Sequence, residues 1–110
     1  MDHSTATLRL ASLAQETRLA IFRTLVQAGP EGLNPGTLAE RLDIAQATLS
    51  FHLKELRHAD MILSRQQGRF IFYSANFEAM NGLLSFLTDN CCAETGAQCL
   101  PPPCCDEAST

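Results

Sequence analysis

The sequence lacks a long hydrophobic run. A helix that crosses a membrane needs roughly 20 consecutive apolar residues, and no stretch of this chain approaches that length. The first residues, MDHSTATLRLASLA, also lack a basic segment followed by an apolar block, the pattern of a secretory signal peptide. We therefore expect no membrane partner and a cytoplasmic location.

Basic residues are scarce, with eight Lys and Arg against twelve Asp and Glu and a net charge of −4. All eight bases lie in residues 1–75, which carry a net charge of +1, whereas residues 76–110 hold five acids and no Lys or Arg. Residues 44–75 carry +2. Any contact with nucleic acid must therefore be local, and its affinity must depend on a few phosphate contacts that a dimer would double.

Cysteine is absent from the first 90 residues, yet five cysteines follow. They are Cys91, Cys92, Cys99, Cys104 and Cys105. An odd number of clustered cysteines in a cytoplasmic chain favours thiolates that bind a soft ion over a disulfide framework. Because glycine and three consecutive prolines also interrupt this part, we expect a folded domain over residues 1–90 and a flexible cysteine-rich tail over 91–110.

Residues 37–57, TLAERLDIAQATLSFHLKELR, have the pattern of two short helices joined by a tight turn. Apolar residues recur at helical spacing in both halves and predict one buried stripe on each helix. The second helix keeps a free face of amide, hydroxyl, aromatic and cationic side chains, which suits base edges, thymine methyls and phosphates. The candidate DNA-binding residues here are Gln46, Ala47, Thr48, Ser50, Phe51, Lys54 and Arg57. A helix-turn-helix with its second helix in the DNA major groove is the hypothesis, and an ordinary helical hairpin is the alternative.

Residues 64–74 differ in character, because aromatic and β-branched residues surround Gln67-Gly68. Two short strands and a turn fit this pattern best. Such a hairpin beside a helix-turn-helix is a wing. Arg65 and Arg69 flank its tip, where they could reach phosphates or the minor groove, or simply be solvated.

Three further helices are predicted around this unit. One covers residues 4–14, one begins at Gln15-Glu16-Thr17 and ends at Gly29-Pro30, and one follows Asn76. The helices over 4–14 and 76–89 carry apolar residues beyond what one small core needs. We therefore expect them to form the interface of a homodimer, with plain core packing as the alternative.

Taken together, these residues resemble the ArsR/SmtB metal-sensing repressors. The resemblance rests on the segments LAQETRLAIF (13–22), LAERL (38–42), LSFHLKEL (49–56) and GRFIFY (68–73). It covers residues 8 to about 88 in the family's order and spacing. It implies a mainly α fold with a small β-hairpin, a homodimeric winged helix-turn-helix over residues 1–90, and repression of transcription from double-stranded operator DNA until a metal or metalloid binds.

The sequence lacks two metal-binding motifs that are known in the family, and this reduces the number of possible ligands. Residues 34–42 lack the Cys-Val-Cys motif of many arsenic sensors, and residues 76–90 lack the histidines of the zinc sensors. The Cys91-Cys92 pair, with Cys99 further on, is similar to a branch of arsenic repressors whose site lies in this region. The resemblance implies trivalent arsenic or antimony as the inducer.

Trivalent arsenic and antimony suit three thiolates. Cys91, Cys92 and Cys99 are the first choice of ligands, and Cys104 or Cys105 could replace one of them, bind a second ion or hand metal on. Zinc or cadmium on four thiolates is the chemical rival. Inert or redox-labile thiols are a further alternative.

Two other classes of function compete with the arsenic-responsive repressor. A thiol redox sensor would respond to peroxide without metalloid, and a metallochaperone would use the tail without a DNA-binding face. No acid/base pair, nucleophile motif or phosphate loop is visible. We therefore expect neither an enzyme nor a catalytic cofactor.

Overall fold

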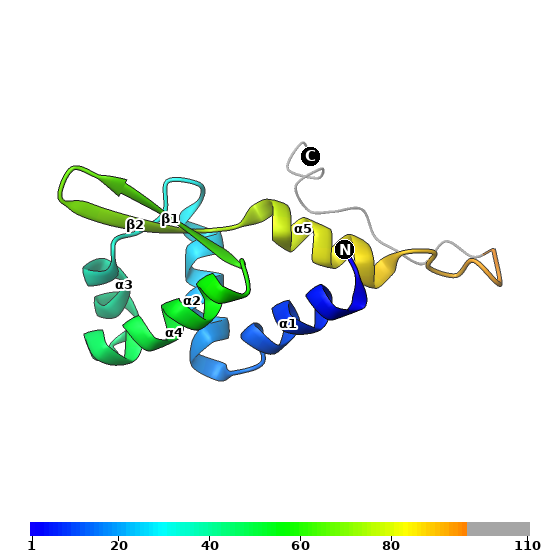
Figure 1. The fold of residues 1–110 in the computed structure, drawn as a ribbon, viewed down its shortest axis with the longest axis horizontal. Helices are drawn as coiled ribbons and strands as arrows, with labels where there is room; N and C mark the ends of the chain where they lie inside the picture. Colours follow the sequence, from blue (N-terminus) through cyan, green and yellow to red (C-terminus); the bar gives the residue numbers. More distant parts are fainter. Residues whose placement is uncertain (97–110) are drawn as a thin grey trace.

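The computed structural model describes residues 1–96 of the 110-residue chain. Its elements in chain order are α1 (His3–Leu13), α2 (Glu16–Ala28), α3 (Pro35–Leu42), α4 (Gln46–His58), β1 (Ile62–Gln67), β2 (Phe70–Ala75) and α5 (Phe77–Thr88). Figure 1 shows α3, α4 and the hairpin at one end of the molecule, and α1 beside α5 towards the other. The predicted winged helix-turn-helix, mainly α with one β-hairpin, is confirmed.

Helices α2, α3 and α5 begin where the sequence supplies a capping side chain. Asn34 Oδ1 accepts the Thr37 N–H at 2.8 Å, and Pro35 occupies the first helical position of α3. Gln15 caps α2 by accepting from Arg18 N, and Asn76 caps α5 by accepting from Ala79 N. A side-chain acceptor at this position satisfies one of the amides that the first turn leaves unpaired. The capped helix starts are therefore determined locally.

The helix-turn-helix is held at its turn by backbone geometry. Asp43 ends α3 with a left-handed conformation (φ 53°), and Ile44 N donates to Ala39 O at 3.1 Å. These contacts turn the chain so that α4 begins at once. The buried stripe of α4 then faces α3, α2 and α1.

The core gathers around α4. Leu49 and Leu56 are fully buried, and they pack with Ile21 and Leu25 of α2 and with Leu38 of α3 in one cluster of buried residues. Removing an aliphatic side chain of this kind from a core costs about 2–5 kcal/mol. The position of α4 is therefore fixed by the same contacts that hold the domain together.

The wing is an antiparallel hairpin in which Gln67 pairs with Phe70 and Ile62 with Ala75. Strand β1 begins at Ile62, two residues before the expected start at Ser64, because Ile62 is buried in the core. The other edge of β2 bonds to Leu33, which exchanges two backbone hydrogen bonds with Tyr73 at 2.8 and 2.9 Å. Gly32 makes this approach possible, since a Cβ there would lie 2.1 Å from Tyr73 O.

Helix α5 leads away from the wing, and its contacts run along α1. The His3 ring meets the Phe86 ring edge-on, with centroids 5.1 Å apart. The helix ends at Thr88, and turns continue through Gly96. Among the helices of residues 1–96, none has the length and apolar character needed to cross a bilayer.

Candidate nucleic-acid interface and cysteine pair

The candidate interface is the exposed face of α4. The predicted DNA-binding residues on this helix are all exposed: Gln46, Ala47, Thr48, Ser50, Phe51, Lys54 and Arg57. The Phe51 side chain is 58% exposed, a large fraction for an aromatic ring on a folded domain. The structure therefore brings these residues together on one helix, opposite the stripe that α4 buries.

The start of α4 faces solvent without a side-chain acceptor. Ala45 is the N-cap residue, and no side chain bonds the first amides of the helix. These amides and the helix dipole make such an end favourable for an anion, phosphate included. Lys54, two turns further along, adds a cation on the exposed face.

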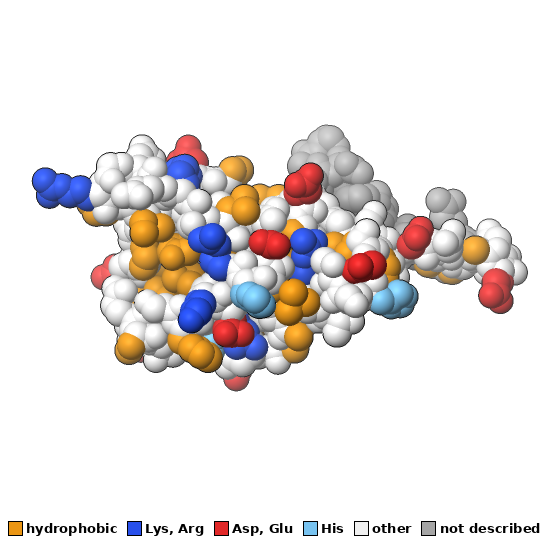
Figure 2. Space-filling model, viewed as in Figure 1, with side chains coloured by type: hydrophobic (Ala, Val, Ile, Leu, Met, Phe, Trp, Pro, Cys, Tyr) orange, Lys and Arg blue, Asp and Glu red, His pale blue; other side chains and the backbone are white. Residues whose placement is uncertain are grey.

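Arg57 connects the end of this face to the wing. Its Nη1 atom donates a hydrogen bond to Ser64 Oγ on β1. The exposed face of α4 and the wing are thus joined by a side-chain contact. Figure 2 shows Lys and Arg side chains over this side of α4 and at the tip of the hairpin.

The two wing arginines have different surroundings. Arg65 donates to Glu31 O at 3.1 Å and to Gln67 Oε1 at 3.2 Å, and its guanidinium lies 5.0 Å from the centre of the Phe72 ring. It therefore fastens β1 to the loop between α2 and α3. Arg69 is exposed beside Gly68 in the turn, and no hydrogen bond holds its side chain within residues 1–96.

His52 belongs to the buried side of α4. Its side chain is 9% exposed, and its Nδ1 atom has no hydrogen-bond partner within the described part of the chain. Burial lowers the pKa of His52, the nearby Arg18 cation lowers it further, and Glu55 opposes both effects. His52 is therefore part of the helix packing and does not belong to the exposed face of α4.

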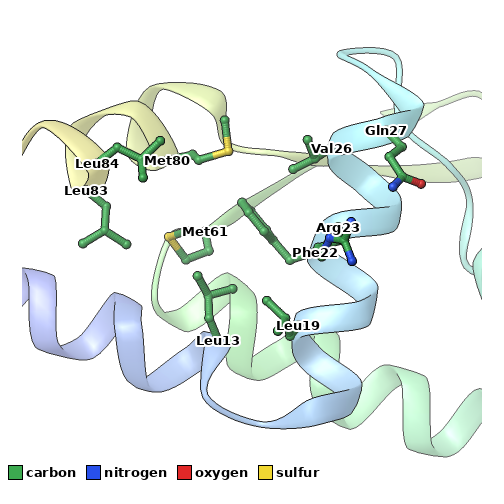
Figure 3. A pocket seen from close by; sticks show the side chains of 10 residues that line it. All are labelled: Leu13, Leu19, Phe22, Arg23, Val26, Gln27, Met61, Met80, Leu83 and Leu84. Carbon is green, nitrogen blue, oxygen red and sulfur yellow. The ribbon is translucent and has the colours of Figure 1, made fainter. Parts of the chain in front are cut away.

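An apolar groove of about 350 Å³ opens between α2 and α5. Figure 3 shows side chains from both helices pointing into it, together with Leu13 from the end of α1 and Met61 from the segment after α4. Leu19 and Leu84 on its walls are 44% and 54% exposed. The region predicted to form a dimer interface thus carries solvent-exposed apolar surface.

The cysteine pair lies just beyond α5. Cys91 N donates to Thr88 O at 3.0 Å, which places this residue directly after the last helical turn. The Sγ atoms of Cys91 and Cys92 are 3.5 Å apart. Cys91 is a free thiol, whereas Cys92 is disulfide-bonded in this structure, which differs from the expected free thiolate. Residues 1–96 contain no cluster of three potential metal ligands. Cys99, Cys104 and Cys105 lie outside the described residues.

Two residues that bind the end of α4 were not predicted from the sequence. Arg9 of α1 donates to Ala59 O, and the Asn76 side chain donates to Asp60 O. Asn76 was recognisable as the cap of α5, but its second partner lies 16 residues away, and that of Arg9 lies 50 away. No local pattern could have revealed these bonds.

The sequence is similar to those of several known proteins. Residues 13–65 match a helix-turn-helix domain family. The chain is similar to the arsenical resistance operon repressor of Bacillus subtilis, with 36% identity over 84 residues that cover 76% of each chain. It is also 32% identical over 80 residues to the nodulation protein NolR of Rhizobium meliloti, of which it spans 63%, slightly less than two thirds.

A solved structure shares the fold. An ArsR-like transcriptional regulator from Rhodococcus sp. RHA1 superposes with a TM-score of 0.71 and 26% identity, over 84% of this chain and 83% of that one. The similarity thus extends beyond the helix-turn-helix to most of the elements described above.

The buried His52 predicts a loss of stability in acid. Because the pKa of His52 in the folded protein lies below the ordinary histidine value of about 6.5, the unfolded chain binds the proton more readily. The free energy of unfolding should therefore fall as pH decreases below about 6.5, by at most about 1.4 kcal/mol per pH unit from this group. Urea unfolding at several pH values should show this decrease weakened in His52→Leu and retained in the exposed control His58→Leu. Equal pH profiles for His52→Leu and the wild type would contradict the assignment.

Proposed function

The chain belongs to the ArsR family of winged helix-turn-helix transcriptional regulators, and we propose that it is a homodimeric repressor that leaves its operator when trivalent arsenic or antimony binds its cysteines. Three surfaces carry this function: the exposed face of α4 for DNA, the apolar surface of α1 and α5 for the second copy, and the cysteines after α5 for the inducer.

The proposal of DNA binding rests mainly on the exposed face of α4. Gln46 and Ser50 present amide and hydroxyl groups of the kind that read base edges, and the exposed Phe51 ring offers apolar contact to thymine methyls. Lys54, Arg57 and Arg69 supply charge for phosphates, with Arg65 behind the wing tip. These few cations match the small positive balance of residues 44–75.

The exposed apolar residues on α1 and α5 support the proposal of a dimer. Leu8 and Leu10 of α1 are 44% and 41% exposed, and Leu84 and Leu87 of α5 are 54% and 55% exposed. The groove beside Leu84 adds apolar surface that a second copy would cover. A two-fold dimer would set its two α4 helices about 34 Å apart, one DNA turn, and would therefore favour an inverted-repeat operator.

The inducer site is proposed at Cys91 and Cys92 in the reduced chain. The two residues are adjacent in the chain and their Sγ atoms lie 3.5 Å apart, so that after reduction both thiolates could bind the same soft ion. A third thiolate completes the preferred set for trivalent arsenic. Cys99 is proposed for this role, with Cys104 or Cys105 as the substitute.

The position of the proposed inducer site directly after α5 suggests how inducer binding would change operator affinity. Cys91 follows the last turn of α5, so closing thiolates around an ion there would strain or re-angle this helix. Because α5 is also a proposed dimer helix, its movement would change the separation of the two α4 helices. A coupling of about 1–3 kcal/mol would lower operator affinity roughly 5- to 150-fold, and DNA would weaken inducer binding by the same factor.

Alanine variants of the exposed face of α4 test DNA binding. Gln46→Ala and Ser50→Ala should each lose about 1–3 kcal/mol of operator affinity and relax selectivity, because each removes a base contact. Fluorescence anisotropy with an operator duplex selected from random sequences measures both effects. Ser85→Ala makes the same chemical change on an exposed position of α5 and should bind normally. Unchanged affinity and selectivity in Gln46→Ala and Ser50→Ala would show that this face does not read DNA.

A charge on the apolar surface of α5 tests the dimer. Leu84→Glu would bury a carboxylate in the interface, so sedimentation should show a monomer, and operator affinity should be lost. Glu78→Gln, an exposed position on the same helix, serves as the control and should remain dimeric. A dimeric, repressing Leu84→Glu protein would place the interface elsewhere.

Serine variants test the inducer site, since serine cannot replace a soft thiolate. Cys91→Ser and Cys92→Ser should bind the operator normally yet fail to release it with arsenite or antimonite, and Cys99→Ser should do the same. Truncation after Gln98 should also abolish release, whereas truncation after Leu100 keeps Cys99 and should respond. Anisotropy titrations of the operator complex measure release.

The pattern of responses separates the alternatives. An arsenite response from the chain truncated after Gln98 would refute the three-thiolate site. Failure of both truncations would assign the third ligand to Cys104 or Cys105. Release by zinc or cadmium alone, or by peroxide without metalloid, would replace arsenic by the corresponding signal.

A further inference from the structure

The residues that follow α4 accept hydrogen bonds from α1 and from the N-cap residue of α5. The helix ends at His58, and Asp60 takes a left-handed conformation (φ 60°) that turns the chain towards β1. The carbonyls of Ala59, Asp60 and Met61, three consecutive residues, all point to donors that lie far away in the sequence. We call these three residues the α4 exit.

Arg9 is the donor from α1. Its Nε atom bonds Ala59 O at 3.3 Å in a partly buried position. Carbonyls at a helix C-terminus carry partial negative charge, so a guanidinium there is favourable both as a donor and as a cation. This bond joins a proposed dimer helix directly to the end of the proposed DNA-reading helix.

Asn76, the N-cap residue of α5, is the second donor, and it uses its backbone N–H and both polar atoms of its side chain. Its backbone N–H donates to Met61 O at 2.9 Å, its Nδ2 donates to Asp60 O at 2.8 Å, and its Oδ1 accepts the Ala79 N–H at 3.1 Å. One side chain therefore caps α5 and holds the α4 exit. The segment after α4 and the start of α5 are therefore linked by two direct hydrogen bonds.

We propose that Asn76 and Arg9 are positioning residues that transmit the state of the dimer helices to α4. This inference rests on the proposed function, because it assigns the path by which inducer binding after α5 reaches the DNA-reading face. Asn76 carries the signal from α5, and Arg9 carries it from α1. Neither residue lies on the exposed face of α4 or among the proposed thiol ligands.

A small change of angle at the α4 exit would displace the opposite end of α4 by a larger amount. Helix α4 has 13 residues, which corresponds to a length of about 20 Å. A tilt of about 5° pivoting at the exit moves the other end of such a helix by about 1.7 Å. That displacement exceeds the tolerance of a hydrogen bond to a base edge, and Gln46 and Ser50 lie in the half of α4 that would move most.

The test removes the bond to Asp60 and keeps the cap of α5. Asn76→Ser retains a capping oxygen but cannot reach Asp60 O, and Asn76→Asp retains Oδ1 but loses the donor. Asn34→Ser makes the same change at the cap of α3, where the side-chain oxygen bonds only the nearby Thr37 amide. Arg9→Lys keeps the charge of Arg9 and removes its Nε donor.

The measured quantity is the ratio of operator Kd with and without arsenite. We expect wild type and Asn34→Ser to share one ratio, within the 5- to 150-fold range, and Asn76→Ser to fall below about twofold. Arsenite affinity, followed by thiolate–arsenic absorbance without DNA, should stay within about twofold in all variants. A residue that only stabilised the fold would leave the ratio unchanged in variants that remain folded. A wild-type ratio in both Asn76→Ser and Asn76→Asp would overturn the inference.

A second readout separates this inference from the proposed inducer. If wild type binds the operator but arsenite does not release it, the proposed inducer is wrong and the path from α4 to α5 can still be measured. Operator binding should then change amide hydrogen exchange at Ala79 and Met80 in wild type and not in Asn76→Ser. The same change in both proteins would refute the role of Asn76.

Discussion

The structure depends on the double use of α4, which is both the centre of the core and the proposed DNA-reading surface. Leu49 and Leu56 on one side are fully buried, while Phe51 on the other is 58% exposed. The helix cannot be displaced freely, because large aliphatic residues in a core cost several kcal/mol to remove.

This constraint explains why the surroundings of α4 matter more than net charge. The chain is acidic overall, yet cations lie on α4 and the wing, with Arg57 and Arg65 bonded to neighbouring groups. Their positions are thereby prearranged, which lowers the entropy lost on binding. Local charge in a fixed geometry can therefore support DNA binding where average composition opposes it.

The proposed inducer site lies at the opposite end of α5 from Asn76. Cys91 follows the last turn of that helix, and Asn76 precedes its first turn. A helix transmits a displacement along its axis because its backbone bonds resist stretching. In the proposed function, this arrangement would connect the inducer site to the α4 exit without any contact between inducer and DNA.

The sequence by itself determined the elements, because helix caps and apolar periodicity act over three or four residues. Asn34, Gln15 and Asn76 mark helix starts, and the spacing of leucines in α4 correctly assigned which face is exposed. Cys99, Cys104 and Cys105 remain a prediction from composition and resemblance.

Only the tertiary structure decided how those elements are joined. The sequence predicts Arg65 as a phosphate contact but not its bond to Glu31 O, 34 residues away, or its position over Phe72. His52 is buried without a partner for Nδ1 within residues 1–96, although its residue type suits DNA equally well. Asn76 and Arg9 meet the α4 exit only after α1, α4 and α5 have packed. Local patterns cannot encode such contacts, because they depend on the angles at which distant helices meet.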